Sequence, residues 1–244
     1  MKDALGERMK EFYENRWRIS LPRRSNVLVR VDGKAFHTYT RGFKFPYDEA
    51  LAGAMDYACK ELCKNAQGAK FGYVQSDEIS VLLTDCDTLT TNAWFDYDQQ
   101  KIATVSASIV TRAFNEKIAE YFSSMPDRKV KFAEFDARAW SMNEQEEVVN
   151  YFLWRQKDAT KNSISALSRA HFSHRQTEKK SSSEKQEMLF AEKGINWNDV
   201  ETGFKRGRAI YYRQENGRGE WVVDKEMPII TEDRNYVKGR MPTY

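Results

Sequence analysis

The sequence predicts an α+β fold. A ferredoxin-like split βαβ domain, with an antiparallel sheet carrying two helices on one face, precedes a C-terminal helical and β-hairpin region. Two observations predict it. Over the first 140 residues, strand-like and helical patterns follow in the order β-α-β-β-α-β. Past about residue 140 the pattern becomes mostly helical and then closes on one hairpin signal. We therefore expect two parts, residues 1–140 and 141–244.

Each element of the first part has a local signal. Short runs rich in β-branched residues indicate strands, and apolar residues repeating every three to four positions indicate helices. Asp48 is a predicted N-cap, because an aspartate there accepts backbone amides. In chain order, the expected elements are a helix over 3–16, a strand over 26–31, a helix over 49–65, strands over 69–75 and 79–84, a helix over 98–122 and a strand over 130–137.

The second part begins with one or two helices over 144–171. The polar, Ser/Lys-rich stretch 173–186 predicts a mobile loop, and a short helix over 184–193 ends at Gly194. Residues 208–213 and 220–224 flank a Gly-containing loop and predict a hairpin.

Bulk composition excludes several classes. A hydrophobic fraction of 41% in 244 residues is enough for a packed core, and a net charge of +3 does not by itself indicate nucleic-acid binding. Three cysteines without neighbouring ligands predict buried thiols rather than a zinc site. No apolar run approaches the roughly 20 residues of a membrane span. We expect a cytoplasmic protein that does not enter membranes.

Acidic residues end two strands that the fold makes neighbours. Asp32 follows the first strand, and Asp77 and Glu78 lie between the second and third. Each motif alone is first a turn signal. Because the first and third strands are adjacent in this fold, the carboxylates approach each other, and Mg²⁺ would relieve their repulsion while bridging nucleotide phosphates. Successive strand residues point to opposite faces. Asp77 is therefore predicted to bind the ion and Glu78 to support it.

Groups suited to a triphosphate surround these acids. Arg30 shares a strand face with Asp32, the missing Cβ of Gly33 permits close approach, and Ser76 is a hydroxyl donor. The loop that follows supplies Lys34, His37, Arg41 and Lys44, while Phe36 and His37 are candidates to frame a base, with core packing an equal alternative for Phe36.

A second basic surface is predicted in residues 141–244. The cations fall in three groups, on a helix, in the polar stretch and before the hairpin, and together they favour an RNA backbone contact over ordinary solvated surface. They are Arg155, Lys157 and Lys161; His174, Arg175, Lys179 and Lys180; and Lys205, Arg206 and Arg208.

Three motifs in order resemble the tRNA-histidine guanylyltransferase family, in its bacterial-type, guanylyltransferase-like branch. They are Val29–His37 (VRVDGKAFH), Gln75–Glu78 (QSDE) and Tyr151–Asp158 (YFLWRQKD), with a further likeness at Phe204–Gly207. The resemblance implies a palm-like catalytic domain over 1–140, with 141–244 contacting RNA and completing the nucleotide site. It implies ATP activation of an RNA 5′ phosphate, followed by attack of the 3′-hydroxyl of GTP or another nucleoside triphosphate, and a homotetramer.

Site residues carry over by position. The resemblance implies that Asp32, the Gly33 carbonyl and Asp77 hold two Mg²⁺ ions, that Asp32–His37 (Ala35 included) and Ser76 contact nucleotide, and that Arg30 and Asn162 contact triphosphate. Two departures matter. Thr160–Ser163 retains only Asn162 of the eukaryotic His-Ile-Asn-Asn run, which predicts broad tRNA specificity, and Phe45 replaces the usual basic residue before Pro46, leaving Lys44 as its candidate substitute.

Two alternatives remain open. A purine-nucleotide cyclase shares the palm and its paired carboxylates, although Gln75–Ile79 lacks the Gly-Gly-acidic-Glu-Phe run of that class. A non-catalytic RNA-binding protein would have no need of clustered carboxylates at Asp32 and Asp77.

Overall fold

A computed structural model describes residues 3–123, 131–215 and 217–242 of the chain. Its centre is one six-stranded antiparallel sheet of order β4-β1-β3-β2-β5-β6. The first four strands have the order 4-1-3-2 of a split βαβ domain, which confirms the predicted fold class. The strands are β1 (Asn26–Gly33), β2 (Ala69–Gln75), β3 (Glu78–Thr84), β4 (Phe135–Ser141), β5 (Arg208–Glu215) and β6 (Arg218–Asp224).

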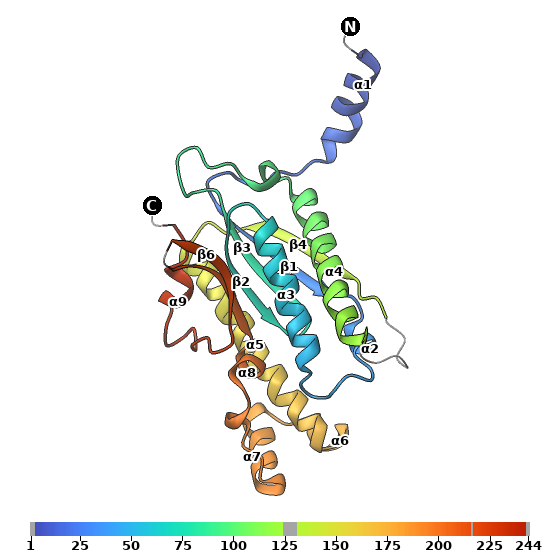
Figure 1. Ribbon diagram of the computed structural model, residues 1–244, viewed down its shortest axis with the longest axis vertical. Helices are drawn as coiled ribbons and strands as arrows, with labels where there is room; N and C mark the ends of the chain where they lie inside the picture. Colours follow the sequence, from blue (N-terminus) through green and yellow to red (C-terminus); the bar gives the residue numbers. More distant parts are fainter. Residues whose placement is uncertain (1–2, 124–130, 216, 243–244) are drawn as a thin grey trace.

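Two helices, α3 (Glu49–Asn65) and α4 (Gln99–Ser123), cover one face of the sheet, as predicted (Figure 1). Asp48 caps α3 by accepting the amides of Ala50 and Leu51 at 2.9 and 3.0 Å, which confirms the N-cap. Alternate residues of β1 and β3 face these helices, and Val29 and Val81 are fully buried among them. This core packs the two helices against the sheet.

The opposite face carries a single long helix, α5 (Gln145–His171). Leu28, Phe71 and Leu82 of the sheet pack against Val148 and Phe152 of that helix. Because both faces are covered, every residue of β3 is buried, the polar residues Glu78, Ser80 and Thr84 included. Strands β5 and β6 extend the same sheet, so residues 141–244 add to the first architecture while building a small core of their own around Leu189 and Trp197.

Two expected elements differ. The predicted strand over 130–137 lies instead at Phe135–Ser141, while residue 130 falls outside the described residues. Asn115 of α4 explains the shift: its side chain pairs with the Ala133 amide at 2.8 Å and carbonyl at 2.9 Å, which ties the preceding residues to the helix.

The predicted mobile loop over 173–186 was wrong. It forms the short helix α6 (His174–Thr177) and the first five residues of α7 (Ser182–Lys193). Ser173 with Gln176, and Ser181 with Glu184, form capping boxes that start the two helices. The serines that suggested a loop are therefore helix N-caps. A further helix, α8 (Thr202–Arg206), precedes β5, and α9 (Asn235–Lys238) packs on α5.

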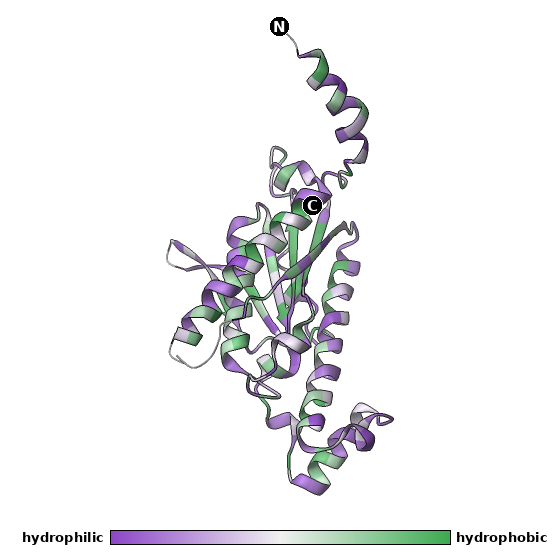
Figure 2. Ribbon diagram, turned by 90° about the vertical axis from the view of Figure 1, so that its right-hand side faces the viewer, coloured by the Kyte–Doolittle hydropathy of each residue, from purple (hydrophilic) through white to green (hydrophobic). Residues whose placement is uncertain are grey.

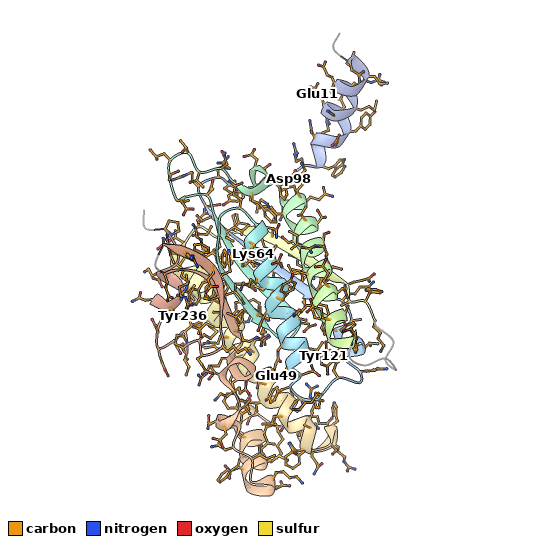
Figure 3. The ribbon with its side chains drawn as sticks, in the orientation of Figure 1. Glu11, Glu49, Lys64, Asp98, Tyr121 and Tyr236 are labelled. Carbon is orange, nitrogen blue, oxygen red and sulfur yellow. The ribbon has the colours of Figure 1, made fainter. Side chains whose placement is uncertain are left out.

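The chain begins with an arm over residues 3–17, made of α1 (Ala4–Met9) and the π-helical and 3-10 turns that follow. It extends away from the sheet (Figure 1), and Figure 3 shows its side chains, Glu11 among them, clear of the rest of the molecule. Figure 2 shows apolar residues along it. Hydrogen bonds from Leu21 to the Tyr97 carbonyl and from Gln99 to the Ile19 carbonyl, both 2.9 Å, fasten its base.

Buried Asp85, just after β3, anchors this base. Its carboxylate accepts hydrogen bonds from the side chain of Arg23 at 2.8 Å and from the amides of Arg24 and Ser25. Burial alone would raise the pKa of Asp85, but these donors outweigh it and the pKa lies below its usual value. Such a group stabilises the fold above its unfolded pKa of about 3.9. That contribution is lost as the pH falls through the lower folded value.

We expect Asp85→Asn to lower the free energy of unfolding by about 1–3 kcal/mol at pH 7, because an amide cannot satisfy all these donors. The deficit should shrink as the pH falls below about 4, because the unfolded wild-type chain then takes a proton on Asp85 and the folded chain follows at lower pH. Urea unfolding at pH 7 and pH 3 measures both effects. A deficit of equal size at the two pH values would contradict the assignment.

Within the described residues, no helix is long and apolar enough to cross a membrane.

Candidate active site

The acidic residues of β1 and β3 lie together at one edge of the sheet. Asp32 stands directly opposite Glu78 in the β1–β3 register, and the Gly33 amide donates to the Asp77 carbonyl at 3.1 Å. Ser76 adopts a left-handed conformation with φ of +47°, which makes the β2–β3 connection a tight turn. The predicted approach of Asp32, Asp77 and Glu78 is confirmed.

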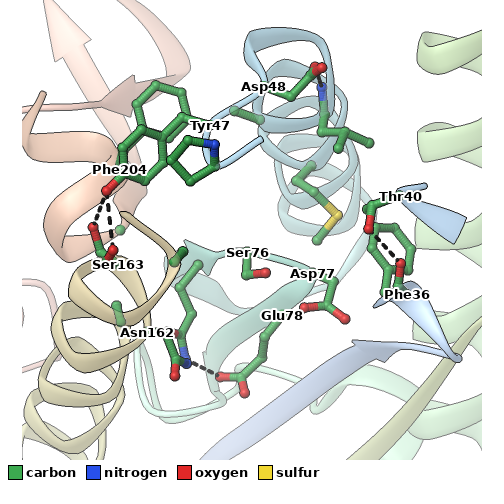
Figure 4. Close-up of a pocket in the computed structure, with 18 of the residues that line it drawn as sticks. Phe36, Thr40, Tyr47, Asp48, Ser76, Asp77, Glu78, Asn162, Ser163 and Phe204 are labelled. Carbon is green, nitrogen blue, oxygen red and sulfur yellow. Dashed lines mark hydrogen bonds between the residues drawn. The ribbon is translucent and has the colours of Figure 1, made fainter. Parts of the chain in front are cut away.

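The expectation that Asp77 and Glu78 cannot enter one site was wrong. Asp77 belongs to the turn rather than to a regular strand, so the alternation rule does not separate it from Glu78, and both line one cavity (Figure 4). Burial raises the pKa of Asp77, and the nearby charges of Asp32 and Glu78 raise it further. A bound cation would offset this repulsion.

The cavity has a volume of about 490 Å³, a size suited to a small-molecule ligand. Its floor is the acidic cluster, one wall is the Phe43–Asp48 segment with the start of α3, and the other is α5 with the α8–β5 turn. On α5 the lining residues recur every three or four positions, as one helix face requires; they are Arg155, Asp158, Ala159, Asn162, Ser163, Ala166 and Arg169.

An aromatic stack closes the end away from the acids (Figure 4). The rings of Tyr47 and Phe204 lie 5.0 Å apart with an interplanar angle of 27°. The Tyr47 hydroxyl donates to the Ser163 carbonyl at 3.2 Å, and Trp197 donates from its indole to the Ser163 hydroxyl, also at 3.2 Å. This rigid apolar end contrasts with the charged floor. The cavity therefore offers flat stacking surfaces at one end and clustered carboxylates at the other.

Glu78 itself is held by Arg155 of α5. The guanidinium donates from Nε and Nη2 to the two carboxylate oxygens, each at 2.7 Å, and both side chains are about nine-tenths buried. Asp158 accepts a further bond from the same Nη2 at 3.0 Å. Arg155 was predicted to contact RNA; that was wrong, because this pairing leaves no exposed guanidinium.

Two other predicted RNA contacts are also buried. Arg208 pairs with buried Asp56 at 2.5 Å and donates to the Gly203 carbonyl. Lys205 donates to the Asn198 carbonyl at 2.5 Å. Both cations are consumed by internal partners, so these expectations too are corrected. Lys157 and Lys161 are exposed on α5, and Arg206 is partly exposed.

The residues around Gly33 are placed differently from expectation. A Cβ at Gly33 would lie 2.2 Å from the Phe36 ring, so the space is taken by an aromatic side chain rather than left for a phosphate. Phe36 belongs to a buried cluster with Tyr39, Phe114 and Phe135, although its ring edge also lines the cavity.

The remaining predicted nucleotide contacts differ in whether they line the cavity. Lys44, Ser76 and Asn162 line the cavity. Lys34 and His37 are exposed and outside its lining; the Lys34 ammonium pairs with Glu134 at 2.6 Å, and the His37 ring lies 3.1 Å from the Thr38 hydroxyl. Ala35 is a left-handed residue before the short helix α2 (Phe36–Tyr39), and Arg30 is a partly buried neighbour of Tyr151.

Several lining residues had no place in the sequence-based site. Arg169 follows Asn162 by seven positions, a spacing that identifies it from the helix period alone. Asp136 of β4 lies outside the cavity lining, but it stands opposite Asp32 in the β1–β4 register and pairs with Arg138 at 3.3 Å; its position depends on the true bounds of β4. The Tyr47–Phe204 stack joins residues 157 positions apart and has no local signal.

The donor set suits a hard cation that also binds substrate. Asp32 and Asp77 offer carboxylate oxygens and Gly33 a carbonyl, the ligand types that Mg²⁺ prefers. Within residues 3–123, 131–215 and 217–242, no group of three or more His, Cys, Asp or Glu side chains is placed to hold a metal ion by itself. Mg²⁺ is commonly held by one or two carboxylates with phosphates and water completing its shell, which fits this pair.

Comparison with known proteins adds independent findings. The family model described as Thg1, tRNAHis guanylyltransferase, matches residues 6–143. The tRNA(His) guanylyltransferase of Saccharomyces cerevisiae is 30% identical over 204 residues, covering 78% of this chain and 83% of that protein. The structure of the yeast enzyme, 24% identical in the superposition with a TM-score of 0.71, shares the fold.

Two solved structures resemble nearly the whole chain. A bacterial tRNA(His) guanylyltransferase (Thg1)-like protein in complex with ATP has 48% identity and a TM-score of 0.89, covering 97% of this chain and 98% of that one. A structure with the same description in complex with GTP has 46% identity and a TM-score of 0.84, covering 98% and 99%.

Proposed function

The chain belongs to the Thg1 family of tRNAHis guanylyltransferases, and from that premise we propose that it is a 3′-5′ nucleotidyltransferase that adds nucleotides to the 5′ end of tRNA. The observation that carries the proposal is that the Asp32 and Asp77 carboxylates both line a cavity of about 490 Å³ and lie near enough for the charge of one to raise the pKa of the other. Similarity over nearly the whole chain to proteins solved with ATP and with GTP supports nucleoside triphosphates as the ligands of that cavity.

Asp32, Asp77 and the Gly33 carbonyl are the proposed ligands of two Mg²⁺ ions, which would polarise phosphoryl oxygens and neutralise charge as a phosphate is transferred. The tight turn supports this role, because the hydrogen bond from the Gly33 amide to the Asp77 carbonyl fixes the backbone of Asp77 beside β1. Glu78 is proposed to support Asp32 and Asp77 rather than to bind the ions itself.

Lys44, Ser76 and Asn162 are the proposed phosphate contacts, because they line the cavity on three sides of the acids. Lys44 is exposed, as a residue that substitutes for the usual cation before Pro46 needs to be. Arg30, Lys34, Ala35, Phe36 and His37 stay proposed nucleotide contacts from the family motif. Phe36 acts through its ring edge, and Lys34 would have to exchange Glu134 for phosphate.

For RNA, the exposed or partly exposed cations Lys157, Lys161 and Arg206 are the proposed backbone contacts. The chain departs from the eukaryotic motif at 160–163, which supports a broad tRNA substrate range. Residues 1–140 are proposed as the palm and 141–244 as the region that completes the site, since α5 supplies Asn162 to the cavity. The cytoplasmic location stays a prediction.

The arm supports a homo-oligomer, proposed as a tetramer. Among residues 3–17 none is buried, and large apolar side chains are exposed along it, Leu5, Met9, Phe12, Tyr13 and Trp17. Isolated helices shorter than about 12–15 residues are marginal in water. An arm of this kind therefore needs a protein surface on which its apolar side chains can pack. Sedimentation of wild type and of a Leu5→Ser/Met9→Ser variant tests this; equal masses would contradict it.

Incubation with Mg²⁺, labelled nucleotides and a tRNA lacking its first 5′ residue tests the main proposal. The RNA should carry either a monophosphate, with ATP supplied, or a triphosphate. We expect template-matched extension at the 5′ end, on tRNAHis and on other truncated tRNAs. Cyclic nucleotide formed without RNA would indicate the cyclase instead, and RNA binding with neither product would indicate a non-catalytic RNA-binding protein.

A further inference from the structure

The interior bonds of Arg155 point to a role that its position in the sequence does not suggest. Two parallel hydrogen bonds of 2.7 Å join its guanidinium to both oxygens of Glu78, the geometry in which arginine binds carboxylate most strongly. In Figure 4 the Glu78 side chain extends toward α5, while Asp77 lies beside it on the side of Thr40. The pairing therefore fixes the residue next to a proposed ion ligand.

The same guanidinium connects the floor of the cavity to its wall. It donates to Asp158 at 3.0 Å, and the Asn162 amide reaches the same Asp158 oxygen at 3.4 Å. Gln75 adds a contact of 3.4 Å to Glu78 from the far side of the turn. A continuous set of bonds thus runs from the turn that presents Asp77 to Asn162, a proposed triphosphate contact one helical turn beyond Asp158.

Burial makes this connection hard to replace. Both partners are about nine-tenths buried, and the centroid of the Trp154 ring lies 4.4 Å from the guanidinium carbon of Arg155. A lysine would keep the charge but could not bridge two oxygens at once or present a planar face to the indole. An unpaired Glu78 would carry an uncompensated buried charge beside Asp32 and Asp77, and would compete with them for any cation that they bind.

We propose that Arg155 is a positioning residue for nucleotidyl transfer, which acts through Glu78. It locks that carboxylate on the α5 side, so that the ions meet Asp32 and Asp77 in a fixed geometry. The inference rests on the proposed function, but it concerns how the ions are held and does not require a particular tRNA.

A double-mutant cycle of Arg155→Lys and Glu78→Gln tests it, with Arg112→Lys on the exposed Arg112–Glu116 pair of α4 as matched control. Two readouts are needed: kcat and KM for 5′-end extension, and Mn²⁺ binding followed by electron paramagnetic resonance with GTP present. We expect Arg155→Lys to lower kcat roughly tenfold and to shift the Mn²⁺ midpoint at least about threefold, with KM for tRNA unchanged. The double variant should lose no more than the worse single one, because coupled residues are not additive.

Multiplicative losses in the cycle, or an effect confined to KM for tRNA, would overturn the inference and return Arg155 to RNA contact. Unchanged Mn²⁺ binding in Arg155→Lys would also overturn it. Asp158→Asn is a second probe at a partly exposed position, where misfolding is not a concern, and should shift the Mn²⁺ midpoint in the same direction by a smaller factor. If wild type binds Mn²⁺ but extends no RNA, the proposed function fails, while the Mn²⁺ arm still decides the role of Arg155.

Discussion

Asp77→Asn is expected to lower the rate of 5′-end nucleotide addition by roughly three orders of magnitude or more, with the chain still folded. The asparagine has the same shape and keeps the turn, but it carries no charge to hold a divalent ion against the phosphates. Because Asp77 is destabilised as a carboxylate by burial and by neighbouring Asp32 and Glu78, removing its charge relieves the folded state. Its melting temperature should not fall.

The measurement is kcat/KM for extension of a truncated tRNA at saturating Mg²⁺, beside a thermal melt. Asp32→Asn should behave alike, and the double variant should be no worse than either single one, as expected for residues that act as a unit. Asp87→Asn, at the other end of β3 and part of an exposed pair with Lys70, is the control and should keep wild-type activity. Loss of activity confined to conditions of low Mg²⁺ in Asp77→Asn would show that Asp32 suffices.

Arg208→Met is expected to destabilise the fold by about 3–5 kcal/mol, because it leaves the buried Asp56 carboxylate without its partner. For a chain of this size that corresponds to a fall of roughly 10 °C in melting temperature. The pair joins α3 to β5, so its loss weakens the attachment of the hairpin to the helix that covers the sheet. Calorimetry of the melt measures the effect.

Two controls separate charge burial from general damage. Arg213→Met, on the same strand but half exposed beside Glu220, should cost less than about 1 kcal/mol. Arg208→Met with Asp56→Leu replaces the whole pair by apolar groups and should recover most of the loss. A double variant as unstable as Arg208→Met alone would show that packing of the arginine stem, rather than the stranded carboxylate, is what matters.

The sequence predicts the first three strands and the two helices packed on them well, because their patterns are local and both faces of the sheet are covered, whereas the fourth strand begins later than predicted. The closeness of Asp32 and Asp77 follows from strand order alone. Burial of a charged residue does not follow from any local pattern. Arg155, Lys205 and Arg208 have the composition of a nucleic-acid surface, and only the tertiary position of Glu78, Asn198 and Asp56 shows that each is used internally.

Turn geometry is the other limit. The alternation rule separates Asp77 from Glu78 only if the strand continues through them, and the left-handed Ser76 ends it. A serine in that conformation has no strong signal. The Ser-rich stretch 173–186 shows the opposite case: its capping boxes, with Gln176 and Glu184 three residues after a serine, were present in the sequence but were outweighed by composition.

The contact of Gly33 with Phe36 limits how this chain can change over evolutionary time. Asp32 is followed by a residue whose only permitted side chain is a hydrogen atom, because the Phe36 ring occupies the place of a Cβ. That ring is held by Phe114 of α4 and Phe135 of β4. Substitutions in the aromatic cluster would therefore shift the Phe36 ring and, through it, the backbone next to the proposed ion ligand Asp32. We expect residues 33, 36, 114 and 135 to vary together in related chains, and designs that repack this core to need the four chosen at once.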